Sequence, residues 1–271
     1  MIIMGLAEMM WTTATTLGRS GRFHNGHHLS RHLRRRRGTR KVLVWTLALA
    51  MLIAGFGALR DWRNAAATQD HWASELRRPA LDDELLLVAF GDSAMQGVGA
   101  TSAETTLAGR VSRKMAFLSG RRVIVHNHAG GGATISRILA EQIPPATDAG
   151  AATGGDLARA DVVIVASSND LEQRTGPENY ASDLRRLLAV LDPERTIVSD
   201  LPLEPGRRAY QEVLERATHD AGLPRADFAG SFLSARRSDI FSWLPPHLND
   251  RGYAIWAAAF TTELPSRGHR P

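Results

Sequence analysis

The stretch LLLVAFGDSAMQGVGA, Leu85–Ala100, decides how the rest of the chain is interpreted. It begins with six apolar residues, and the run ends abruptly at Gly91-Asp92-Ser93. A continuous apolar run of this length is typical of a strand that is buried on both faces of a sheet. The stretch therefore predicts a buried strand with a serine just beyond its carboxyl end.

Similar apolar runs recur along the chain and alternate with helix-like stretches. The predicted strands are 85–90, 122–127, 161–166, 195–199 and, more weakly, 225–228. The predicted helices are 104–118, 133–143, 177–191, 206–221 and 249–262. Strands rich in valine and isoleucine that alternate with helices indicate an α/β fold, with a parallel sheet covered on both sides. Ligands of such sheets bind beyond the carboxyl ends of the strands.

Small and polar residues stand at those carboxyl ends. The first strand is followed by GDS, the second by NHAGGGAT (127–134) and the third by SSND (167–170), while HLNDRGY (247–253) opens the last helix. Each block alone fits a turn, a flexible loop or a helix cap. GDSAMQG lacks the glycine spacing of a dinucleotide site, and the chain has no GK[ST] phosphate loop. Together the blocks supply a serine, a histidine and oxyanion donors, which acyl transfer requires.

In this order the four blocks resemble those of the SGNH (GDSL-type) serine hydrolases, over about residues 84–262. The resemblance implies a three-layer α/β/α, flavodoxin-like domain with a five-stranded parallel sheet. It also implies esterase or lipase activity without a metal or other cofactor. Carried over to this sequence, it makes Ser93 the nucleophile and His247 the base. The oxyanion hole would comprise the backbone N–H groups of Ser93 and Gly132 and the side-chain amide of Asn169.

Two positions depart from the pattern of that family. Ser167 stands where the third block usually has a glycine, and Leu244 stands where an aspartate usually orients the histidine. Two replacements for this aspartate remain open at this point: a backbone carbonyl, which would give a Ser–His dyad, or Asp239, eight residues before His247. Losing a triad carboxylate can lower turnover about 10⁴-fold where the histidine takes the wrong tautomer.

The N-terminal part of the chain has a different composition. Residues 1–41 hold nine Lys or Arg against one Glu8, and residues 42–59 hold no charge. An uncharged run of this length is about enough to cross a bilayer, and the cations before it favour a cytoplasmic N-terminus. We expect a basic, disordered cytoplasmic tail (1–41), an uncleaved transmembrane anchor (42–59), a juxtamembrane linker or short helix (60–83) and an extracytoplasmic SGNH hydrolase domain (84–265). A cleaved signal peptide is the alternative.

Charge and cysteine content exclude several other classes of function. The net charge of +5 comes from the tail, and the chain after residue 60 is mildly acidic, the opposite of what nucleic-acid binding needs. The chain has no cysteine, which excludes disulfides and thiolate metal sites. The histidines of the tail (24, 27, 28 and 32) fit solvated side chains better than a metal site.

The sequence as a whole predicts a membrane-anchored serine esterase or lipase. The expected partners are the membrane and an ester substrate, which is a lipid, a lysolipid or an acylated glycan. Two alternatives stay open: a carbohydrate O-deacetylase or acetyltransferase on the same scaffold, and a catalytically weakened domain that binds a ligand.

Overall fold

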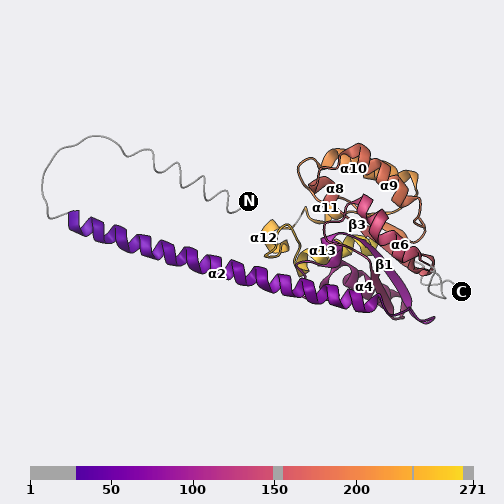
Figure 1. Ribbon diagram of the computed structural model, residues 1–271, viewed down its shortest axis with the longest axis horizontal. Helices are drawn as coiled ribbons and strands as arrows, with labels where there is room; N and C mark the ends of the chain where they lie inside the picture. Colours follow the sequence, from indigo (N-terminus) through magenta and orange to yellow (C-terminus); the bar gives the residue numbers. More distant parts are fainter. Residues whose placement is uncertain (1–28, 149–154, 234, 265–271) are drawn as a thin grey trace. The chain divides into compact units, whose positions relative to one another are not determined.

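The computed structural model describes residues 29–148, 155–233 and 235–264 (Figure 1). Most of the predicted tail therefore lies outside the described residues, as do residues 149–154. The chain divides into two compact units, residues 1–53 and residues 54–271.

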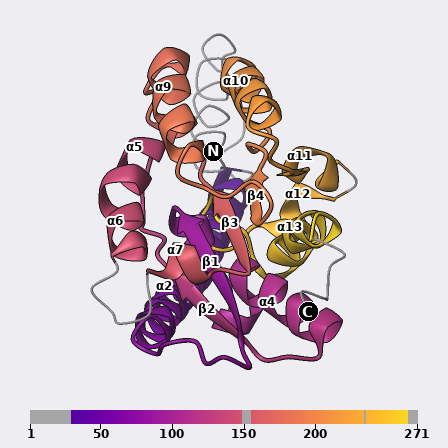
Figure 2. The same cartoon turned by 90° about the vertical axis from the view of Figure 1, so that its right-hand side faces the viewer.

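A five-stranded parallel sheet forms the centre of the second unit (Figure 2). The strands are β1 (Leu85–Gly91), β2 (Val123–Asn127), β3 (Val162–Ala166), β4 (Thr196–Ser199) and β5 (Arg225–Ala226). Their spatial order is β2-β1-β3-β4-β5. Leu85 pairs with Val123 of β2, and Leu87 pairs with Val162 of β3. The five predicted strands are confirmed with small shifts at their ends.

Helices cover both faces of the sheet because side chains of successive strand residues point to opposite sides. In β1, Leu86, Val88 and Phe90 pack on one face, whereas Leu87 and Ala89 pack on the other. The first face is covered by α5 (Ile135–Arg137), a π-helical turn (Ile138–Gln142), α6 (Ile143–Thr147), α9 (Pro177–Leu188) and α10 (Arg207–Asp220). The second is covered by α4 (Leu107–Ser119) and α13 (Asp250–Thr262). The fold is thus the expected three-layer α/β/α arrangement.

Shorter elements lie in the connections. They are α3 (Ser93–Gln96), a 3₁₀ turn (Ala103–Thr105), α7 (Asp156–Arg159), α8 (Asn169–Glu172), α11 (Phe228–Ser231) and α12 (Arg237–Ile240). Both α3 and α8 begin immediately beyond the carboxyl end of a strand. These short helices therefore set the direction in which their first side chains leave the sheet.

Helix α2 (Leu29–Glu75) runs through the predicted anchor and most of the segment predicted as a linker or short helix. Its part Val44–Glu75 is the one candidate membrane span among the described residues. The large apolar side chains between Val44 and Gly57 are exposed, and Trp45 and Phe56 are each 74% exposed. From Gly57 onward one face of the helix is buried, through Gly57, Asp61, Ala65, Thr68 and Trp72. This spacing of three and four residues marks one helical face, which packs on other parts of the same second unit.

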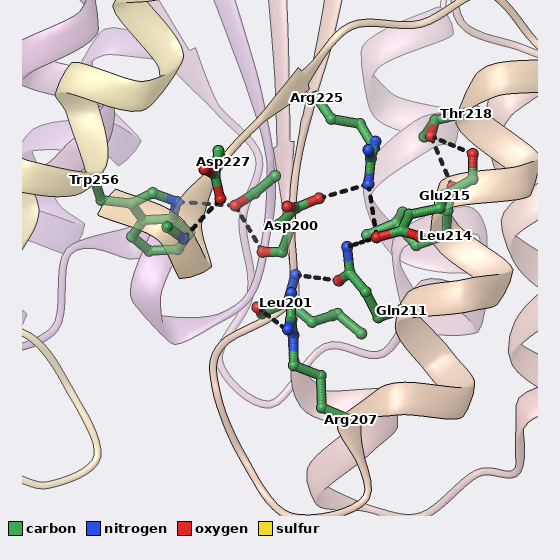
Figure 3. Close-up of polar contacts among 12 residues, drawn as sticks. Asp200, Leu201, Arg207, Gln211, Leu214, Glu215, Thr218, Arg225, Asp227 and Trp256 are labelled. Atoms are coloured by element: carbon green, nitrogen blue, oxygen red, sulfur yellow. Dashed lines mark hydrogen bonds and ion pairs between the residues drawn. The ribbon is translucent and has the colours of Figure 1, made fainter. Parts of the chain in front are cut away.

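Ion pairs and hydrogen bonds connect α10 to β5 and to the residues just after β4 (Figure 3). Nη1 of Arg225 lies 3.0 Å from Oδ1 of Asp200 and 3.4 Å from Oε1 of Glu215. Gln211 donates to Glu215 over 2.9 Å and accepts from the N–H of Leu201 over 3.2 Å. These polar groups bind one another and tie α10 to the sheet.

A buried glutamine fixes the tip of β1. Oε1 of Gln142 accepts from the N–H of Gly91 over 3.0 Å, and Nε2 donates to the carbonyl of Gly91 over 2.8 Å. A side chain has no room at Gly91, because a Cβ there would lie 2.1 Å from the carbonyl oxygen of Ala166. The end of β1 is therefore held in one place, and the chain leaves the sheet from there into Asp92 and Ser93.

Replacing this glutamine should destabilise the fold. In Gln142→Leu the buried N–H of Gly91 loses its partner, and an unpaired buried donor costs about 1–3 kcal/mol of the free energy of unfolding. Urea unfolding of the full chain measures this loss. The control is Gln173→Leu, which removes an exposed amide that donates to Gly132 over 2.9 Å. We expect a change of less than about 0.5 kcal/mol for the control, and equal losses in both variants would contradict the prediction.

Candidate active site

Ser93 is the first residue of α3 and follows the tip of β1 after a sharp turn. Asp92 is the N-cap of this helix, and its Oδ1 accepts from the N–H of Ala94 over 2.9 Å. The helix ends at once, because Gly97 adopts the left-handed conformation with φ of 91°. The turn leaves the side chain of Ser93 half-buried at the edge of the sheet.

The structure brings His247 onto Ser93 from the loop that precedes α13. Nε2 of His247 lies 2.9 Å from Oγ of Ser93, and Nδ1 lies 2.7 Å from the carbonyl oxygen of Leu244. A carbonyl oxygen only accepts hydrogen bonds, so Nδ1 must carry the proton of the neutral ring. Nε2 then presents its lone pair to the hydroxyl of Ser93, which is the tautomer that a general base needs.

Asp239 does not occupy the place of the missing carboxylate. Its Oδ1 accepts from Oγ of Ser238 over 3.0 Å, and its Oδ2 lies 3.5 Å from Nη1 of Arg251. In the part of the chain that the structure describes, no carboxylate is paired with His247. Of the two groups considered in place of the missing aspartate, the backbone carbonyl of Leu244 is the one that contacts Nδ1 of His247.

Asp92 links the first strand tip to the third. Its Oδ2 accepts from the N–H of Ser168 over 2.9 Å and from Nδ2 of Asn169 over 3.1 Å. Burial raises the pKa of Asp92, and hydrogen bonds from the backbone N–H groups of Ser168 and Ala94 oppose that rise. Sequence reasoning missed this role, although an aspartate in front of a short helix is a recognisable N-cap signal.

The loop after β2 is held against the same strand tip. The N–H of Gly130 donates to the carbonyl of Gly91 over 3.0 Å. The side chain of Gln96, at the end of α3, donates to the carbonyl of Ala129 over 3.0 Å. Gly132 follows in this loop with φ of +70°, a conformation that favours glycine. The predicted site residues thus converge at the carboxyl ends of β1, β2 and β3.

Three groups at this edge of the sheet each keep an N–H that is available to a ligand. Within the described residues, the backbone N–H groups of Ser93 and Gly132 form no hydrogen bond. Asn169 uses one amide hydrogen on Asp92 and retains the second, and its side chain is almost buried. These three groups are the donors expected for the oxyanion hole.

The second departure from the family pattern has a structural use. Oγ of Ser167 donates to the carbonyl of Ala133 over 2.7 Å, so the serine ties the third strand tip to the second. Oδ2 of Asp170 adds a further tie by accepting from the N–H of Ile135 over 2.7 Å. The loops that carry Asn169 and Gly132 are therefore joined to each other as well as to β1.

Two histidines of the β2 segment share one carboxylate outside this site. Nδ1 of His126 and Nε2 of His128 lie 2.9 Å from the two oxygens of Asp156. Burial alone would raise the pKa of Asp156, but the two histidines outweigh it and hold that pKa well below its usual range. Burial opposes the charge on His126, yet Asp156 and the carbonyl of Arg78 raise its pKa overall. Among the described residues no cluster fits a metal ion.

Comparisons with known proteins agree with the fold. The sequence model of the GDSL-like lipase/acylhydrolase family matches residues 89–255. No curated protein matches the sequence significantly. Three similar solved structures are a lipase/acylhydrolase from Enterococcus faecalis, an acetylxylan esterase from Geobacillus stearothermophilus and a member of the lipolytic G-D-S-L family from Veillonella parvula. Their sequence identities are 17%, 17% and 16%, with TM-scores of 0.52, 0.52 and 0.51. The matches cover 66%, 70% and 68% of this chain and 95%, 99% and 99% of those chains.

The carboxylate between the histidines should make stability depend on pH. The raised pKa of His126 contributes stability below its unfolded value of about 6.5, and this is lost as pH rises through the folded value. The lowered pKa of Asp156 contributes above about pH 4, and this is lost only in stronger acid. Asp156→Asn should therefore lower the melting temperature more at pH 5.5 than at pH 9.

Thermal unfolding of the full chain at both pH values tests this expectation. Asp82→Asn, which changes an exposed carboxylate, is the matched control and should behave as the wild type does. A loss for Asp156→Asn that is the same at both pH values would contradict the pairing.

Proposed function

Since the chain belongs to the GDSL-like lipase/acylhydrolase family, we propose that it hydrolyses carboxylic esters with Ser93 as nucleophile and His247 as base. The observation that carries the proposal is the 2.9 Å contact between Oγ of Ser93 and Nε2 of His247. The carbonyl of Leu244 on the other ring nitrogen supports it, because that contact selects the reactive tautomer.

In the first half of the reaction, Oγ attacks the ester carbonyl carbon while its proton passes to Nε2 of His247. The carbonyl oxygen becomes an oxyanion, which accepts hydrogen bonds from the N–H groups of Ser93 and Gly132 and from the amide of Asn169. Asp92 holds that amide in place. The protonated ring then gives its proton to the leaving alcohol, and an acyl-enzyme remains.

In the second half, a water molecule gives a proton to His247 as its oxygen attacks the carbonyl carbon of the acyl-enzyme. The bond to Oγ of Ser93 then breaks, His247 returns the proton to Oγ, and the carboxylic acid leaves. During both halves the imidazolium has a neutral carbonyl at Nδ1 where complete triads have an anion. A dipole stabilises the cation less than a carboxylate does, so we expect slower turnover than in complete triads.

The substrate is an ester of a lipid, a lysolipid or an acylated glycan. The structural neighbours include both a lipase/acylhydrolase and an acetylxylan esterase, which supports an ester substrate of either kind. The Ser93–His247 contact supports a hydrolase over the alternative of a domain that only binds a ligand.

We also propose that α2 anchors the chain in a membrane with the N-terminus in the cytoplasm. Large apolar side chains between Val44 and Gly57 are exposed, as lipid-facing side chains are. The uncharged run 42–59 is about long enough to cross the hydrocarbon of a bilayer, and the exposed Trp45 near its start suits an interface, where tryptophan is enriched.

Esterase activity should depend on Ser93. We expect the full chain in detergent to hydrolyse a p-nitrophenyl ester and to bind a fluorophosphonate probe covalently. Ser93→Ala should abolish both reactions without changing the melting temperature, and Ser112→Ala on α4 should change neither. Comparison of acetyl with palmitoyl esters identifies the acyl length. Wild-type turnover in Ser93→Ala would refute the nucleophile, and a wild-type chain that neither turns over nor labels would favour the binding domain.

The proposed topology predicts which part of the chain is accessible from outside. Protease added to intact cells should degrade the hydrolase unit and leave the N-terminal tail protected. Permeabilised cells are the control, in which the tail is degraded as well. Recovery of a soluble mature protein that starts after about residue 57 would instead show a cleaved signal peptide.

A further inference from the structure

Besides its proposed role as an anchor, helix α2 contacts the loop that carries His247. Oδ2 of Asp61 accepts a hydrogen bond from the backbone N–H of Trp243 over 2.8 Å. The Asp61 side chain is 1% exposed, and its other oxygen accepts from Arg60 over 3.0 Å. Burying a carboxylate costs free energy unless hydrogen bonds satisfy it, and here the N–H of Trp243 and the side chain of Arg60 provide them.

The same face of α2 is shaped to the side chain of Trp243. The indole packs directly on the backbone at Gly57, where an added Cβ would lie 2.4 Å from Cγ of the ring. Gly55, two residues earlier, has nothing within 4 Å of such a Cβ. Trp243 is thus held twice by the helix, through its backbone N–H and through its ring.

From Trp243 the contacts lead to the catalytic base. The N–H of Leu244 donates to Oγ of Ser242 over 3.1 Å, and the N–H of Ser242 donates to the carbonyl of His247 over 2.9 Å. The carbonyl of Leu244 accepts from both the N–H of His247 over 3.0 Å and its Nδ1 over 2.7 Å. The position of this carbonyl therefore follows the position of the residue just before it, Trp243.

The helix also reaches the segment of the nucleophile. Nε1 of Trp72 donates to the carbonyl of Gln96 over 3.1 Å, at the end of the short helix that begins with Ser93. One buried face of α2 thus contacts the loop of the base at Gly57 and Asp61 and the turn of the serine at Trp72.

We propose that Asp61 is a positioning residue for His247 and that residues 57–72 of α2 are part of the catalytic unit. This inference rests on the proposed function. Asp61 holds the amide of Trp243, so that the carbonyl of Leu244 faces Nδ1 and keeps Nε2 directed at Ser93. The carboxylate that usually touches the histidine is replaced by a backbone carbonyl, and a carboxylate from the helix supports the loop that supplies it.

Variants at Asp61 test the positioning role in the full chain in detergent. Asp61→Ala should lower kcat for a p-nitrophenyl ester about 10-fold or more and leave KM within about twofold, because a misdirected base slows the chemical step. Asp61→Asn keeps an acceptor for the N–H of Trp243 and should restore part of the loss. Asp70→Ala, on the exposed side of the same helix, is the control and should match the wild type.

Titration with the fluorophosphonate probe separates a positioning effect from loss of folded protein. Turnover is divided by the number of sites labelled at completion, so unfolded chains do not count. A purely structural role would reduce the number of labelled sites and leave kcat per labelled site unchanged, and that result would overturn the inference.

Glycine variants provide an independent test that adds atoms instead of removing a bond. Gly57→Ala should displace Trp243 and lower kcat per labelled site, while Gly55→Ala should leave it unchanged. An active wild-type chain whose kcat survives both Asp61→Ala and Gly57→Ala would overturn the positioning role alone. A wild-type chain that hydrolyses no ester would overturn the proposed function, and the positioning role with it.

Discussion

The hydrogen bond between Nδ1 of His247 and the carbonyl oxygen of Leu244 is the constraint on which the rest of the site depends. A carboxylate side chain can rotate to follow an imidazole, whereas a carbonyl oxygen moves only with its backbone. The tautomer of the ring is therefore set by the conformation of the loop between α12 and α13. Everything that fixes this loop, including the bridge between Phe241 and Leu248, contributes to the orientation of the base.

Side chains, more than long loops, join the three strand tips around Ser93. Gln142 clamps Gly91, Asp92 holds Ser168 and Asn169, and Ser167 reaches Ala133. Buried hydrogen bonds of this kind keep donors oriented before a substrate arrives, which lowers the reorganisation needed in the transition state. The same groups that stabilise the sheet edge thus prepare it for a developing negative charge.

Much of this architecture could be predicted from the sequence, because strands rich in valine and isoleucine have a strong local pattern. The pairing of Ser93 with His247 was predicted from the resemblance of the four sequence blocks to the SGNH hydrolases. The group at Nδ1 could not be predicted, since every residue has a carbonyl and Leu244 shows no sign of its use. The docking face of α2 was also hidden, because it includes Gly57, Asp61 and Thr68, which give no hydrophobic periodicity.

The buried face of α2 constrains the number of residues in this helix more strictly than it constrains which residues they are. Contacts at Gly57 and Asp61 and at Trp72 must face the same side, and an α-helix turns by about 100° for each residue. One residue inserted between Asp61 and Trp72 would turn these two groups of contacts about 100° apart. The helix could then contact either the loop of His247 or the turn of Ser93, but not both. Removing seven residues would nearly restore the facing but shorten the span between the contacts by about 10 Å. Substitutions on the outer face leave this register unchanged, so the helix tolerates changes of residue there far better than changes of length.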